Sequence, residues 1–333
     1  MIVAQTTHGP VFIRHADVRV PEAQTAIDRS HSLHCLCTGS PGSPLYARGR
    51  PGEKHLARAP GTAARHLSGC PHSSEPNLAA ALGAPRGSFA ESDGHITVNF
   101  SALFRQDTSS GAGSGGGVCT AKGNPLLSLL YFLLVRAGLH IALPGIAQRD
   151  AFHELRVAAA QIHVIGGAKP ATLADLLFTP MRGARDSGYV TEIRRDRLQR
   201  AAHQQLPVLT VSFVPWQENS QMAGGDLQLR NDLGPSTWLS RKSYLAALRA
   251  ASRANSGFQP MNPALLFCLA DVKKILANDE GRGLYAKVNR CVILPVSPTL
   301  LPLPTAQVAA AFEAANRARE VFAMRPAADP RLR

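Results

Sequence analysis

The sequence contains no apolar run long enough to cross a bilayer. Its most apolar stretch, residues 126–135, is roughly half as long as the 20 or so residues that a transmembrane helix needs. The first twenty residues lack a basic segment followed by an apolar one, so they do not have the pattern of a secretory signal. We therefore expect no membrane partner and a cytoplasmic location, and we interpret residues 126–135 as a buried helix.

Cysteine and aromatic residues are also few. Six cysteines in 333 residues, with one Cys-x-Cys pair and the others scattered, lack the dense pattern of a disulfide scaffold. Aromatic residues make up 6% of the chain, but the apolar fraction of 45% is ordinary for a globular protein and argues against wholesale disorder. A chain of this length can bury a substantial core, and we expect two domains.

Acidic residues are too few to balance the basic ones, which gives a formal net charge of +13. Residues 1–124 contain 11 Lys and Arg against 8 Asp and Glu (net +3), whereas residues 125–333 contain 25 against 15 (net +10). A positive field attracts polyanions, so DNA or RNA is one expected partner. An arginine-rich genome gives the same charge without such a ligand, so the charge alone leaves both interpretations open.

A segment rich in glycine and serine, residues 109–117, divides the chain. It cannot bury an apolar face, which predicts a flexible linker over residues 105–124 between an N-terminal module, 1–104, and a basic domain, 125–333. The mixed order of elements predicts an α+β fold, with a small zinc-ribbon-like N-terminal β-hairpin module followed by a mixed α/β domain.

The periodicity of the apolar residues predicts the individual elements. In the N-terminal module we expect a helix over 21–32, a hairpin of strands 45–48 and 54–58, and a strand over 95–100. In the basic domain we expect helices over 126–139, 151–164, 171–178, 190–205, 239–254 and 307–322, and strands over 207–214, 226–230, 264–272 and 288–296.

Two pairs of metal-ligand residues flank the predicted hairpin. Cys35 and Cys37 precede it, and His66 and Cys70 follow it. A hairpin returns the chain to its starting point, so it brings the two pairs together, and three thiolates with one imidazole are a ligand set of structural zinc. Four protein ligands leave no position for water or substrate, so we expect a structural site. His72 is an alternative fourth ligand, and reduced thiols or a redox pair are alternatives to a metal.

These residues resemble the start of a bacterial family known as domain of unknown function 1173, whose members occur in plasmids and integrative conjugative elements. The resemblance rests on the segments 34–37, 45–48, 55–62, 66, 70–71, 126–139 and 293–296. It implies His66 rather than His72 as the fourth ligand, and other mobile-element proteins as partners. It also implies that this chain lacks the family's C-terminal extension. The family has no established activity to carry over.

A cluster of arginines lies on the predicted helix 190–205. Arg194, Arg195, Arg197 and Arg200 place several guanidinium groups on one side of that helix, as a surface that contacts phosphates does. An ordinary solvated helix face has the same composition.

Other motifs have weaker support. Residues 111–116 fit Gly-x-Gly-x-x-Gly, but no helix begins there and no acidic residue follows at the spacing that a dinucleotide site requires. Asp271-Val272-Lys273 has the local shape of some metal-dependent nucleases but lacks a nominated second carboxylate. Cys268 and Cys291 lie in apolar runs and are expected to be small buried side chains.

No Gly-x-Ser-x-Gly or His-Glu-x-x-His motif occurs. We therefore expect a non-catalytic, zinc-stabilised protein that binds nucleic acid. The alternatives are a protein-interaction subunit of a conjugation or plasmid apparatus, and a metal-dependent nuclease.

Overall fold

The computed structural model of the chain describes residues 1–39, 42–62, 66, 70–72, 88–92, 95–104, 124–143, 150–166, 170–180, 188–214, 227–229, 237–254, 264–274, 284–297, 299–303, 306–318 and 320–324. Helices and several separate sheets occur together, so the predicted α+β class is confirmed. No helix in these ranges is both long and apolar enough to span a bilayer. The predicted linker lies outside these ranges except for Asn124, and so do the glycines of residues 111–116.

The N-terminal region forms a five-stranded antiparallel sheet. In spatial order its strands are β2 (Gly9–Ile13), β1 (Ile2–Thr6), β3 (Ser30–Cys35), β4 (Ser43–Arg48) and β5 (His55–Arg58). The short 3-10 turn η1 (His15–Asp17) and helix α1 (Pro21–Asp28) connect β2 to β3. Strands β4 and β5 confirm the predicted hairpin. Strands β1 to β3 were not predicted. The predicted helix 21–32 was wrong at its end, because α1 ends at Asp28 and β3 begins at Ser30. Strand β3 buries only Leu33 and Cys35 among serine and histidine residues, which hides its alternation.

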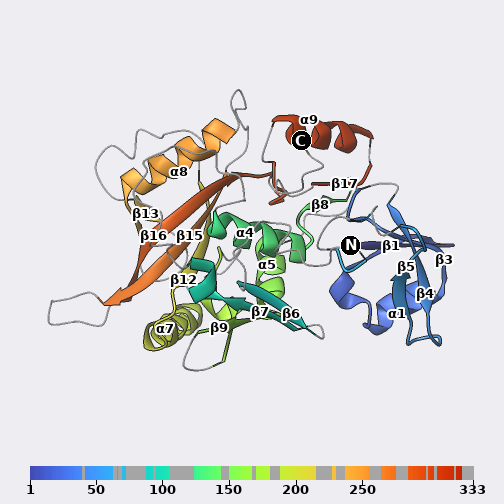
Figure 1. Cartoon of the computed structure of the whole chain (residues 1–333), viewed down its shortest axis with the longest axis horizontal. Coiled ribbons are helices and arrows are strands. Elements are labelled where there is room, and N and C mark those ends of the chain that lie inside the picture. The colour runs from blue at the N-terminus through green and yellow to red at the C-terminus, as the bar shows by residue number, and fades with distance from the viewer. Residues whose placement is uncertain are drawn as a thin grey trace.

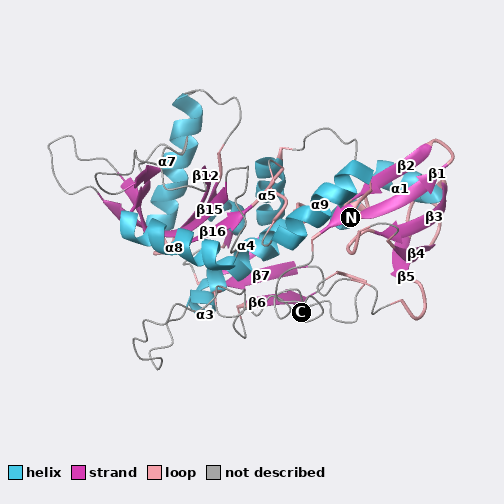
Figure 2. Cartoon of the chain, turned by 90° about the horizontal axis from the view of Figure 1, so that it is seen from above, coloured by secondary structure: helices cyan, strands magenta, loops and turns pink. Residues whose placement is uncertain are grey.

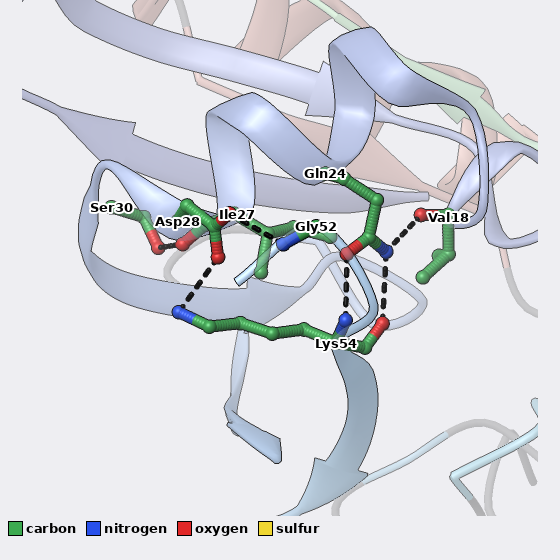
Figure 3. Close-up of polar contacts among 7 residues, drawn as sticks. All are labelled: Val18, Gln24, Ile27, Asp28, Ser30, Gly52 and Lys54. Atoms are coloured by element: carbon green, nitrogen blue, oxygen red, sulfur yellow. Dashed lines mark hydrogen bonds and ion pairs between the residues drawn. The ribbon is translucent and has the colours of Figure 1, made fainter. Parts of the chain in front are cut away.

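Helix α1 is attached to this sheet by polar contacts around one buried side chain (Figure 3). Gln24, which is 4% exposed, donates from Nε2 to the carbonyl oxygens of Val18 (2.6 Å) and Lys54 (2.8 Å). Its Oε1 accepts from the backbone N–H of Lys54 at 2.7 Å. At the end of the helix, Asp28 accepts from the backbone N–H of Gly52 and pairs with Lys54 Nζ at 2.9 Å. The helix therefore fixes the turn that leads into β5.

A second sheet joins residues from both sides of the predicted linker. Its order is β10 (Ala171–Thr172), β9 (Ile162–Ile165), β7 (His95–Asn99) and β6 (Phe89–Ser92), and β7 pairs with β9 in parallel. Helices α3 (Phe100–Phe104), α5 (Ala151–Ala160) and α6 (Leu173–Leu176) adjoin it. The predicted helix 151–164 was therefore wrong at its end, where the β-branched alternation of β9 takes over. The predicted helix 171–178 is only the single turn α6 between short strands.

Helix α4 (Pro125–Arg136) is the buried helix that the sequence predicts. Its nine consecutive residues 126–134 are all buried, which is the behaviour of a helix that is apolar on every side. Asn124 caps its start by accepting from the backbone N–H of Leu127 at 3.2 Å. Gly138, with φ +70°, follows its end.

The third sheet has six strands and two long helices against it. Its order is β11 (Leu177–Phe178), β12 (Val208–Val214), β15 (Ala264–Lys274), β16 (Leu284–Pro295), β14 (Thr237–Leu239) and β13 (Leu227–Leu229), and the helices are α7 (Gly188–His203) and α8 (Arg241–Ala254). Helix α9 (Ala306–Ala318) and the pair of short strands β8 (Ile141–Ala142) and β17 (Phe322–Ala323) complete the described elements. The long helices and strands that the sequence predicts here are confirmed.

The sheets are spread along the long axis of the molecule. Figure 1 shows the N-terminal sheet at one end, the six-stranded sheet at the other, and α4 and α5 between them. Seen from above, α7 and α8 lie at the end away from β1 to β5 (Figure 2). The N-terminal sheet has a small core of its own, whereas β7 and α3 contribute to the large core around α4 and the six-stranded sheet. The predicted division into domains stays a prediction, although residues 88–104 pack with the second half.

Candidate metal centre

The four predicted ligands meet beside the N-terminal sheet. Cys35 is the last residue of β3, and Cys37 follows two residues later. His66 and Cys70 come from the segment that follows β5. All four side chains are buried, with exposed fractions between 0% for Cys35 and 6% for Cys70. A sequence separation of up to 35 residues is therefore closed by the pairing of β3, β4 and β5.

Three separations between the ligand atoms have the values expected in a tetrahedral site. The sulfurs of Cys35 and Cys70 are 3.6 Å apart, and the Nδ1 atom of His66 lies 3.6 Å from Cys37 Sγ and 3.7 Å from Cys70 Sγ. Bonds of zinc length at the tetrahedral angle put two sulfurs about 3.8 Å apart and a sulfur and a nitrogen about 3.6 Å apart. All four ligand atoms lie within 4.8 Å of one another, so the group can hold a metal ion.

The backbone at this corner allows no side chain at residue 42. Gly42 has φ +81°, and a Cβ atom there would lie 2.9 Å from the carbonyl oxygen of Cys35. Leu36 donates its backbone N–H to the carbonyl oxygen of Met1 at 2.9 Å, and Gly39 donates to that of Leu36 at 3.0 Å. These bonds fold the chain around the first two cysteines before it enters β4.

The thiols of the cluster do not ionise independently. Hydrogen bonds from Cys37 and Cys70 lower the pKa of Cys35, because they stabilise its thiolate. The hydrogen bonds that Cys70 makes to Cys35 and Cys37, together with burial, raise the pKa of Cys70. Several thiolates side by side in a buried site repel one another, and a divalent cation would compensate for their charge.

The structure selects His66 over His72. His72 is not part of the group of four, and its ring centroid lies 5.6 Å from that of His66 and 5.2 Å from that of His15. The Nε2 atom of His15 lies 3.6 Å from Cys35 Sγ. Burial is the main cause that lowers the pKa of His15 to about 4, so its ring is neutral at pH 7 and can donate one N–H to the sulfur. No pattern in the sequence points to His15, since it lies at no ligand spacing from the cysteines.

A cavity of about 460 Å³ lies between this cluster and the rest of the molecule. Cys37 and Cys70 border it on one side, and Arg136, His140 and Glu154 on the other. Arg14 spans the boundary, because its guanidinium pairs with both Asp17 and Glu154, which raise its pKa. Burial lowers the pKa of His140 to about 3, so its ring is neutral. The cavity thus carries charges of both signs that are paired with each other.

The arginines of α7 do not form one continuous surface. Arg195 and Arg200 are exposed, but exposed Glu192 and Asp196 lie among them. Arg197 turns inward, where its guanidinium donates to the carbonyl oxygens of residues 174, 175 and 177 and stacks on the Phe178 ring at 4.4 Å. The prediction that Arg197 binds phosphate stays a prediction, although carbonyl oxygens of α6 and β11 already accept from its Nε and Nη2 atoms. The side chain of Arg194 lies outside the described residues.

Helix α8 has a cationic face that the sequence search missed. Lys242 and Arg249 are exposed and seven residues apart, which places them on the same side of the helix. Tyr244, Leu248 and Ala251 are buried on the opposite side. The helix contains no Asp or Glu. The signal was present in the sequence, as a helix whose every charge is positive.

Asp271, the residue on which the nuclease alternative rests, does not lie in a cluster of metal ligands among the described residues. Asp271, near the end of β15, is 43% exposed and lies 3.6 Å from Lys273 Nζ. Within the described ranges, the cysteine and histidine group is the one set of side chains arranged to hold a metal. Glu218 and Asp226, two carboxylates that nothing in the sequence nominates as partners of Asp271, lie outside those ranges, as does Cys119.

Comparisons of the chain with protein-family models, with curated proteins and with solved structures find no match. The resemblance to domain of unknown function 1173 therefore stays a prediction.

Proposed function

We propose that the cluster of Cys35, Cys37, His66 and Cys70 binds zinc as a structural ion. The observation that carries this proposal is that three of the separations between ligand atoms are 3.6–3.7 Å, which fits bonds of zinc length, and that all lie within 4.8 Å. Three thiolates with one imidazole are soft to borderline ligands in tetrahedral arrangement, which favours zinc over magnesium or calcium. All four coordination positions come from the protein, so the ion stabilises the fold and supplies no open position for chemistry.

We further propose that the protein binds nucleic acid through its second half. The support is the net charge of +10 over residues 125–333 and the face of α8 that carries Lys242 and Arg249 without a carboxylate on the same helix. Exposed cations that are not neutralised by their neighbours release counterions when they meet phosphates. On α7, Arg195 and Arg200 offer a weaker site because acidic residues accompany them.

The alternatives have less support. A nuclease centred on Asp271 would need further carboxylates beside it, and its described neighbours are Lys273 and, opposite it on β16, Lys287. A protein-interaction subunit of a mobile-element apparatus is the role that the family resemblance favours. It predicts a copurifying protein and no nucleic acid.

Two measurements on the purified full-length protein test the proposal. Elemental analysis should give one zinc per chain, and Cys37→Ser should lose it. Iron in place of zinc, or no metal, would contradict the first part. A fluorescence titration with a DNA duplex and a single-stranded RNA should give an affinity that falls linearly with salt on logarithmic axes.

A pair of charge-matched variants locates the surface. Lys242→Glu with Arg249→Glu should reduce the salt slope by about 2, because each lost phosphate contact contributes about 0.9. Arg19→Glu with Arg50→Glu makes the same change of net charge at exposed positions of the N-terminal region and should alter the slope less. Equal effects of the two variants would show that binding follows net charge and that α8 is not the binding surface. Binding that does not change with salt would contradict the proposed contact with phosphates.

A further inference from the structure

Two cysteines that are 23 positions apart in sequence lie directly opposite each other in the six-stranded sheet. Cys268 of β15 pairs in register with Cys291 of β16, and the strands are antiparallel. Opposite residues in such a pair point to the same face, with Cα atoms about 4.5–5.5 Å apart. A disulfide requires Cα atoms about 4.4–6.8 Å apart, so the backbone already satisfies that requirement.

The two thiols differ in access. Cys268 has no exposed surface, whereas Cys291 is partly exposed at the edge of α8. The thiol of Cys291 donates to the carbonyl oxygen of Ser243, in the first turn of α8, at 3.6 Å. A hydrogen bond from the Cys268 thiol lowers the pKa of Cys291, and burial is the main cause that raises the pKa of Cys268. An oxidant from solvent therefore reaches Cys291 before Cys268. Cys291 is also the better nucleophile of the two.

We propose that Cys268 and Cys291 are a redox modification site that a hydroperoxide converts to a reversible cross-strand disulfide. The Cys291 thiolate attacks one peroxide oxygen, the O–O bond breaks, and the products are the sulfenic acid and hydroxide (an alkoxide from an organic peroxide). The Cys268 sulfur then attacks the Cys291 sulfur, the S–O bond breaks, and the thiol proton leaves with the oxygen as water. For hydrogen peroxide, two thiols are oxidised and one peroxide is reduced to two waters.

This site is separate from the metal centre and does not rest on the proposed nucleic-acid binding. The cysteines of the metal cluster lie beside the N-terminal sheet, at the opposite end of the molecule from β15 and β16 (Figure 1). Oxidation also removes the hydrogen that Cys291 donates to Ser243. The first turn of α8 therefore loses a hydrogen bond when Cys291 is oxidised.

Peptide mapping of the full-length protein tests the proposal. After treatment with hydrogen peroxide, free thiols are alkylated and the protein is digested with trypsin without reductant. Trypsin places the two cysteines in separate peptides, 254–273 and 291–317. The expected product is their cross-linked pair, with the summed mass less two hydrogen atoms, which dithiothreitol separates. Recovery of both peptides fully alkylated, or a link from Cys291 to Cys119, would overturn the proposal.

Two single variants test the order of the steps. In Cys268→Ala, dimedone should trap a sulfenic acid on Cys291, whereas in Cys291→Ala the buried Cys268 should remain an unmodified thiol. Direct oxidation of Cys268 in the second variant would sink the assigned roles. Hydrogen exchange of the backbone amides in the first turn of α8 should change on oxidation of the parent protein and stay constant in Cys291→Ala.

Discussion

The cores of the N-terminal sheet and the six-stranded sheet differ in size and in composition. The core of the N-terminal sheet is a cluster of eleven buried residues, three of which are the cysteines of the metal group. The large core contains α4, β12, β15 and β16, and it is built almost entirely from Leu, Ile, Val, Phe and Ala. A small core buries too little apolar surface to offset the entropy of ordering its loops. With the zinc that we propose, one region would depend on a metal cross-link and the other on packing.

Removal of the metal should have the largest effect and should be confined to one region. Structural zinc contributes on the order of 10 kcal/mol to the domains that it folds. We expect chelation to increase hydrogen exchange strongly in β3 and β4 and to leave β15 and β16 protected. Cys37→Ser should reproduce this pattern without a chelator. Hydrogen exchange that rises equally in both sheets would contradict the claim that only the N-terminal sheet depends on the metal.

Shortening a buried side chain in the large core should destabilise the six-stranded sheet and leave the N-terminal sheet unchanged. Phe267 on β15 has no exposed surface, and replacing it with Ala should lower the free energy of unfolding by about 3–5 kcal/mol through lost burial and a cavity. The metal content should not change. Phe213→Ala, at a position on β12 that is 38% exposed, is the matched control and should cost much less. Loss of metal in Phe267→Ala would show that the two regions unfold as one unit.

Breaking the polar attachment of α1 should weaken the N-terminal sheet alone. Gln24→Ala leaves the partly buried backbone groups of Val18 and Lys54 without their partner, so we expect a loss of about 1–3 kcal/mol. The measurement is the midpoint of unfolding in urea, read from the exchange of β5 amides. Thr25→Ala on the exposed side of the same helix is the control. A loss of protection in β16 that matches the loss in β5 would contradict the assignment.

Acid should act where the two regions meet. Burial lowers the pKa of His140 to about 3, below its value of about 6.5 in the unfolded chain. The unfolded state then binds the proton more readily, so stability is complete above pH 6.5 and is lost as the pH falls toward 3. By pH 5 this loss is about 2 kcal/mol.

His140→Gln should remove this part of the pH dependence. We expect the parent to lose free energy of unfolding as the pH falls, whereas the variant does not lose this part. The difference in free energy of unfolding between the two proteins, measured in urea with zinc in excess, should therefore shrink. Parallel curves for the two proteins over that range would show that His140 does not titrate on unfolding.

Much of the fold was readable because it follows local rules. The uninterrupted apolar stretch of α4, the alternation in β15 and β16, and the turn of the β4–β5 hairpin each predict their own element. The strands β1 to β3 and β9 were missed. The polar residues of β3 hide its alternation, β9 follows directly after a helix, and β1 and β2 are short, with five residues each. Similarly, Arg197 resembles its exposed neighbours in sequence, and only the carbonyl groups of α6 and β11 that it meets distinguish it.

The atoms available to a metal can be read from the sequence alone: two sulfurs before a hairpin, and one sulfur and one imidazole after it. The sequence could not decide between His66 and His72, because that choice depends on which ring the chain turns toward the sulfurs. It also left Cys268 and Cys291 as unrelated apolar residues. Pairing in a sheet brings together residues whose separation in sequence carries no information about their separation in space, so only the register of β15 and β16 places these two thiols side by side.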